Sequence, residues 1–172
     1  MSEPTPEFSR LIPLTRVGPQ PSRHEVEATA EECKRLAQRF DLVTLDRLAA
    51  VVMLQRVSGE LIRLEASFEA EFAQSCVVTL DPVPDRIAET FSLLYGPPAD
   101  DQTEIEIDIG EPVFEPLTGE AIDIGEAVAQ ELALALPDFP RLPGAVVDYS
   151  EASEFEQGSF AVLEHLRRSS QS

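Results

Sequence analysis

The sequence predicts an α+β fold in which an antiparallel meander sheet, or a partly closed barrel, carries two packed helices. Several segments alternate apolar and polar residues like half-buried strands, and two others repeat apolar residues every three or four positions like amphipathic helices. The strand segments follow one another closely, which favours a meander of about five to seven strands. With 172 residues, 43% of them hydrophobic, the chain has enough apolar side chains for one core.

The clearest strand covers residues 61–73, where one parity is apolar and the other is polar or charged. Such a strand buries one face and leaves the other in water. Residues 49–57 precede it through a turn at Gly59, which predicts an antiparallel hairpin. Residues 86–96 and the alternating run at 104–109 predict two further strands.

Residues 29–40 predict the first helix. Thr29 and Glu32 have the spacing of a capping box, in which each side chain bonds the backbone amide of the other residue. Cys33 falls on the apolar face of this helix, so we expect it to be a small buried side chain.

Residues 122–136 predict the second helix, which Pro137 ends. Asp123 stands at the N-cap position, and Glu126 stands three positions later, where it would complete a second capping box. Both carboxylates suit the positive end of the helix dipole.

The composition changes after this helix and divides the chain into three parts. Residues 1–143 are expected to form a single α+β domain, and residues 144–158 an acidic linker of small and polar residues. Residues 159–172 are expected to form a short amphipathic tail, in which Phe160 and Leu163 share a face.

Acidic residues dominate the chain, which has 32 acids, 13 bases and a net charge of −19. Between Arg86 and Arg141 there is no Lys or Arg. Because nucleic-acid binding depends on neutralising phosphates with cations, we expect no strong direct RNA binding. An acidic surface attracts basic partners, but it also keeps a protein in solution, so the charge favours recognition and solubility equally.

Cys76 is followed three positions later by Thr79, where a metal knuckle would place its second sulfur. Zinc sites need four sulfur or nitrogen ligands, and the chain offers two distant cysteines and two histidines, His24 in a loop and His165 in the tail. Cys76 has acids rather than a cation or a helix start nearby, so nothing in the sequence lowers the pKa of its thiol. We expect a turn or strand-end thiol, with no metal, no cofactor and no catalytic residue.

We expect the protein to be cytoplasmic, without a membrane association. The first twenty residues lack the basic and apolar regions of a secretory signal, and no stretch approaches the roughly 18 apolar residues of a membrane helix. Two cysteines are too few for a disulfide framework, which is typical of proteins in a reducing compartment such as the cytosol.

The order of these segments resembles the YceD family, called large ribosomal RNA subunit accumulation protein, in the form typical of alphaproteobacteria. The resemblance covers roughly residues 7–168, and its most specific parts are "QSCVVTLDPV" and "DIGEAVAQELALALP". It implies a C-x-x-C motif where this chain has Cys76 and Thr79, and in some members a second cysteine pair where this chain has "PRLPGA". The tail is similar to a Phe-Ala-Val-Leu ending of the family. The resemblance implies a role in accumulation or processing of large-subunit (23S) ribosomal RNA, without an established catalytic residue.

These observations favour a non-enzymatic accessory factor of ribosome biogenesis that acts through protein–protein contacts. Its partner would be a basic ribosomal protein or rRNA-processing factor, bound by an acidic surface within residues 97–131. The tail would dock either on a partner or on its own domain through its apolar face. The candidate partner-binding residues are Asp100, Asp101, Glu104, Glu106, Asp108, Phe160 and Leu163.

Two alternatives from other functional classes stay open. The carboxylates at 100–108 could serve a metal-dependent nuclease, since Glu104, Glu106 and Asp108 would share one face of a strand. The nuclease alternative is disfavoured because the sequence shows no row of Lys or Arg residues that could bind a nucleic-acid substrate. The other alternative is a structural protein without a ribosomal role.

Overall fold

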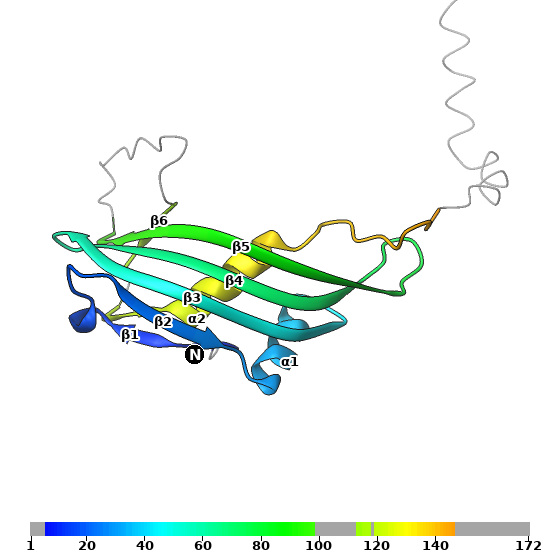
Figure 1. Cartoon of the computed structure of the whole chain (residues 1–172), viewed down its shortest axis with the longest axis horizontal. Helices are drawn as coiled ribbons and strands as arrows, with labels where there is room; N and C mark the ends of the chain where they lie inside the picture. Colours follow the sequence, from blue (N-terminus) through cyan, green and yellow to red (C-terminus); the bar gives the residue numbers. More distant parts are fainter. Residues whose placement is uncertain (1–5, 99–112, 118, 147–172) are drawn as a thin grey trace, which may run out of the picture.

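The computed structural model describes residues 6–98, 113–117 and 119–146. Its main layer is a five-stranded sheet in the order β2-β3-β4-β5-β6, formed by Ser22–Glu27, Thr44–Ser58, Leu61–Ser75, Pro82–Gly96 and Val113–Pro116. A two-stranded sheet pairs β1 (Leu11–Pro13) with β7 (Ala121–Asp123), and the 3-10 helix η1 (Leu14–Arg16) follows β1. Helices α1 (Ala30–Arg39) and α2 (Ile124–Ala135) lie on one side of the large sheet (Figure 1). The predicted α+β class is confirmed.

Strands β2 to β5 form the predicted meander, because each pairs antiparallel with the next. Strand β6 departs from this pattern and runs parallel to β5, with Leu93 opposite Val113. Among the described strands no pairing joins β2 to β6, so the sheet is open and the barrel alternative is wrong. The strand predicted at 104–109 lies outside the described residues.

The hairpin of β3 and β4 turns at Gly59, whose φ of +52° is a left-handed conformation that glycine adopts without a Cβ clash. The predicted apolar parity of β4 is confirmed, since every one of its apolar positions from Ile62 to Phe72 is buried. Strand β3 begins at Thr44, five residues earlier than predicted. A register shift between Leu45 and Arg47 interrupts the alternation there, which hid this part of the strand.

Strand β5 also begins earlier than predicted, at Pro82 instead of residue 86. Pro84 lies opposite Ala73 of β4, while β6 joins β5 only from Leu93 onwards. In its first part β5 therefore pairs only with β4 among the described strands. A proline there loses no hydrogen bond between strands if its missing amide faces the other side.

Helix α1 starts as predicted. The Thr29 hydroxyl accepts a hydrogen bond from the Glu32 amide at 3.3 Å, and the Glu32 carboxylate accepts one from the Thr29 amide at 2.8 Å. Cys33, Leu36 and Ala37 are buried against the sheet, which confirms that Cys33 belongs to the core.

Helix α2 is capped by Asp123, whose carboxylate accepts the amides of Gly125 at 3.1 Å and Glu126 at 3.2 Å. Glu126 does not complete a capping box as predicted. Its carboxylate instead accepts two hydrogen bonds from the Arg39 guanidinium on α1, at 2.7 and 2.9 Å. A bidentate, charge-assisted pair is stronger than a bond to a neutral amide, so Arg39 draws Glu126 away.

The core lies between the helices and the buried face of the sheet. Large, fully buried side chains come from the N-terminal segment, both helices and the central strands, and they include Phe8, Leu36, Leu64 and Leu132. The opposite face of the sheet carries the polar parity of β2 to β5 and has no layer over it in the described part of the chain.

Candidate functional site

Cys76 follows the last residue of β4 and begins a tight turn that runs to Asp81. The Cys76 amide donates to the Asp81 carbonyl at 2.8 Å, and the Leu80 amide donates to the Cys76 carbonyl at 2.9 Å. The Cys76 side chain is fully buried, whereas Thr79 is exposed. The predicted strand-end thiol is confirmed.

The segment that follows α2 packs against this turn. The Val77 amide donates to the Pro140 carbonyl at 2.9 Å, and the Leu142 amide lies 3.5 Å from Cys76 Sγ as a donor. In Figure 1 the chain after α2 runs beside the turn between β4 and β5 at one end of the sheet. The fold thus brings together the two positions that the sequence singled out, Cys76 with Thr79 and the "PRLPGA" segment at 140–145.

The pKa of the Cys76 thiol is lowered to about 6. The main cause is the hydrogen bond from the Thr79 hydroxyl, followed by the amide of Leu142 and the amides of Thr79 and Val78. The expectation that nothing lowers this pKa was wrong, because it considered only cations and helix starts and not hydroxyl and amide donors. The sulfur is enclosed, so the donors stabilise the turn and do not present a nucleophile to a substrate.

Apart from the two cysteines and Thr79, the structure describes only His24 among the groups considered as metal ligands or catalytic residues. His24 lies in β2, not in a loop, and its ring bonds the Ser22 hydroxyl at 3.1 Å. Within residues 6–98, 113–117 and 119–146, no three His, Cys, Asp or Glu side chains come close enough to hold a metal ion. His165, the carboxylates from Asp100 to Asp108, and the tail residues Phe160 and Leu163 lie outside the described residues.

The described part of the acidic surface includes Glu115 on β6 and Glu131 on α2. Partial burial and the charge of Glu115 raise the pKa of Glu131. Burial raises the pKa of the neighbouring Tyr95 to about 12, with further contributions from Glu115, Asp123 and Glu131. The tertiary structure therefore brings Glu115 of β6 close enough to Glu131 of α2 and to Tyr95 of β5 for its charge to affect both, which spacing along the chain did not indicate.

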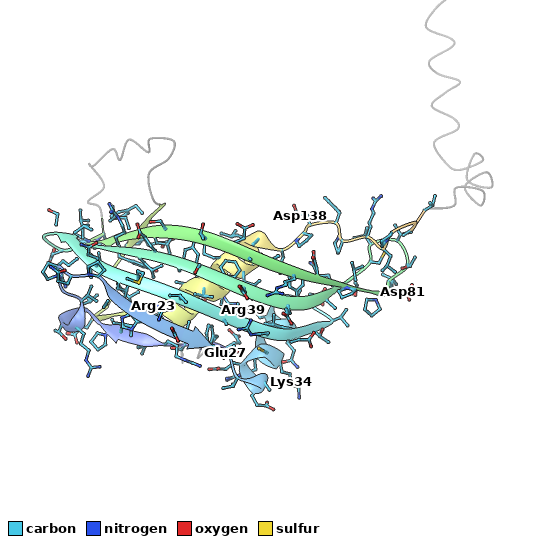
Figure 2. All side chains as sticks on the ribbon, viewed as in Figure 1. Arg23, Glu27, Lys34, Arg39, Asp81 and Asp138 are labelled. Carbon is cyan, nitrogen blue, oxygen red and sulfur yellow. The ribbon has the colours of Figure 1, made fainter. Side chains whose placement is uncertain are left out.

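The open face of the sheet holds four arginines, Arg23, Arg47, Arg63 and Arg86, and among the described residues all but Arg63 form ion pairs with glutamate. Arg47 lies 3.3 Å from both Glu27 and Glu69, Arg86 lies 3.1 Å from Glu69, and Arg23 pairs with Glu25 (Figure 2 labels Arg23 and Glu27). A hollow of about 660 Å³ lies on this face, and Ala49, Val51, Ser67, Ala88 and Thr90 are among the residues that line it. Ion pairs with glutamate offset the charge of three of the four arginines, so little positive charge on this face is left for phosphates.

No helix in the described part of the chain is both long and apolar enough to cross a membrane.

Comparison with protein families matches residues 64–166 to the family described as "Large ribosomal RNA subunit accumulation protein YceD". The matched segment starts within β4, includes the Cys76–Asp81 turn and α2, and extends into the tail to residue 166. No curated protein and no solved structure matches the chain. Since the match covers more than half of the 172 residues, the chain belongs to the YceD family of large ribosomal RNA subunit accumulation proteins.

Proposed function

We propose that the protein is a non-enzymatic, cytoplasmic accessory factor that supports the accumulation and processing of 23S ribosomal RNA through protein–protein contacts. Family membership supports the link to large-subunit ribosomal RNA. The observation that carries the mechanism is the net charge of −19 together with the absence of any Lys or Arg between Arg86 and Arg141. Such a chain repels RNA phosphates and attracts basic proteins.

The partner is a basic ribosomal protein or rRNA-processing factor. Its binding surface consists of Asp100, Asp101, Glu104, Glu106 and Asp108 together with Glu115 and Glu131 from the same acidic segment, residues 97–131. Glu131 supports this assignment: burial raises its pKa first and the charge of Glu115 adds to the rise, and a cation placed between the two carboxylates would relieve that repulsion. The ion pairs on the open sheet face support it as well, because they offset the charge of three of the four arginines there and leave little positive charge for RNA.

A capture experiment with a matched charge control tests this proposal. In the test variant, the five carboxylates from Asp100 to Asp108 become amides. In the control variant the same number of exposed carboxylates in the first half of the chain become amides, namely Glu31, Asp41, Asp46, Glu60 and Glu65. We expect the wild type and the control to retain basic proteins at low salt and to release them at high salt, and the test variant to retain few at either.

Two results would contradict the proposal. If the protein retains nucleic acid and no protein, the contact with RNA is direct. If purified protein cleaves precursor RNA with magnesium and loses this activity on changing Glu106 and Asp108, the protein is a nuclease.

A further inference from the structure

Four exposed apolar side chains lie on the two segments that meet beside the buried Cys76. Val77 and Leu80 of the turn are 45% and 76% exposed, and Phe139 and Val146 of the segment after α2 are 76% and 80% exposed. The backbone contact from Val77 to Pro140 joins the two segments that carry these residues. We use the name apolar patch for Val77, Leu80, Phe139 and Val146. Clustered apolar side chains of this size on a surface usually mark a contact with another segment or molecule.

Leu80 shows that this exposure is not a by-product of the turn. Its φ of +64° is left-handed, a conformation that costs a branched side chain energy and that turns normally assign to glycine or asparagine. The turn therefore holds a leucine in an unfavourable backbone conformation while pointing it into solvent, which indicates that its side chain has a contact to make.

We propose that the tail of this same chain, residues 159–168, docks on the apolar patch. The described chain ends at Val146, which belongs to the patch, and twelve residues separate Val146 from Ser159. A flexible chain of that length has a root-mean-square span of about 20 Å, so it reaches any side of the patch. A short linker also holds a tethered segment at an effective concentration of about millimolar, which favours this occupant over a second copy.

The composition of the tail fits the patch. Phe160 and Leu163 are three positions apart and share one face of a helix, and Leu166 extends that face by another three. Arg167 and Arg168 follow, and they are two of the three bases that the chain has after Arg86. Asp81 and Asp138 are exposed beside the patch, from the turn and from the segment after α2 (Figure 2). The apolar face and the two arginines thus meet an apolar surface with carboxylates beside it.

The match to the YceD family extends to residue 166, so it contains the turn, the segment after α2 and the apolar part of the tail together. Docking would shield Leu80 and Phe139 from water in the isolated protein. It requires no partner, so it stands or falls separately from the proposed binding of a basic protein.

A tryptophan at position 160 tests the docking, because the chain has no other tryptophan. In the full chain carrying Phe160→Trp, we expect emission shifted to shorter wavelength and weaker quenching by acrylamide than in the urea-unfolded protein. Adding Leu80→Asp and Phe139→Asp should abolish both effects. Leu11→Asp is the matched control, since Leu11 is 64% exposed on β1 of the other sheet, and it should abolish neither.

Three outcomes would overturn the proposal. Emission like that of the unfolded protein would show that the tail is undocked in the isolated chain. A shift that survives the two patch substitutions would place the tail elsewhere. A shift that disappears on dilution would show that the patch receives a second copy of the chain. Circular dichroism of each variant establishes that the domain is folded.

Discussion

The amide of Leu142 donates to the sulfur of Cys76 across 3.5 Å and 66 residues of sequence. This contact ties the end of β4 to the segment after α2, so the two distinctive motifs of the chain form one structural unit. The other groups that lower the pKa of this thiol belong to the turn itself, and the Thr79 hydroxyl contributes most.

Replacing Thr79 with Val should raise the pKa of the Cys76 thiol from about 6 toward its ordinary value of 9.0, because the hydroxyl donor is lost while the size of the side chain is kept. Ultraviolet absorbance of the thiolate against pH measures this pKa. The measurement uses a Cys33→Ala background, since Cys33 is the other cysteine. Cys33→Ala alone should leave the pKa of Cys76 unchanged. If Thr79→Val does not change the pKa of Cys76 either, the hydroxyl is not the group that lowers it.

Asp123→Ala should lower the free energy of unfolding by about 2 kcal/mol or more. The carboxylate caps α2, and it also accepts the Arg10 amide at 2.7 Å and the Ser9 hydroxyl at 2.5 Å, so its loss frees the N-terminal segment as well as the helix. Urea denaturation checks the change. Asp138→Ala is the control, since this exposed carboxylate should matter by less than about 0.5 kcal/mol. Equal effects of the two substitutions would show that Asp123 is no more than a surface charge.

Gly125→Ala should destabilise the protein by about 2 kcal/mol, although alanine usually favours a helix over glycine by about 1 kcal/mol. A Cβ at Gly125 would lie 2.7 Å from the Phe8 carbonyl and 3.0 Å from the Arg10 amide, and both are backbone atoms that cannot rotate away. At Gly18 a Cβ would meet nothing within 4 Å, so Gly18→Ala serves as the control and should be nearly neutral. Thermal unfolding distinguishes the two, and a stabilised Gly125→Ala would refute the close packing of α2 on the N-terminal segment.

Glu32 should make the free energy of unfolding depend on pH in the acidic range. Its hydrogen bonds from Arg10 are the main reason that its pKa falls from 4.5 to about 2. The folded state therefore binds this proton less readily than the unfolded state. The stabilisation is complete above pH 4.5 and is lost as the pH falls toward 2.

Glu32→Gln should accordingly cost about 1 to 2 kcal/mol at neutral pH and progressively less below pH 4.5. Denaturation curves collected from pH 7 to pH 2 show the convergence. Glu31→Gln, an exposed change in the same first turn, should follow the wild type at every pH. If the difference in unfolding free energy between Glu32→Gln and the wild type does not change with pH, the pair with Arg10 does not lower the pKa of Glu32.

The class of fold and the local elements could be predicted from patterns along the chain. Alternation in residues 61–73 and the spacing of Thr29 and Glu32 act between neighbouring residues, so the buried face of β4 and the start of α1 follow from them. The first residues of β3 and β5 were harder to predict. A register shift near Arg47 breaks the alternation in β3, and a proline such as Pro84 is tolerated in β5 only where a neighbouring strand is missing.

Which distant groups meet follows from the packing of the whole chain. The parallel pairing of β6 with β5, the ion pair of Glu126 with Arg39 and the bond from the Leu142 amide to Cys76 all join residues far apart in the chain. The exposure of Leu80 and Phe139 on two segments that meet has the same origin, since nothing in the sequence near either residue specifies the other segment. Local patterns report the burial and hydrogen bonding of one segment, whereas contacts between segments depend on how the whole core packs.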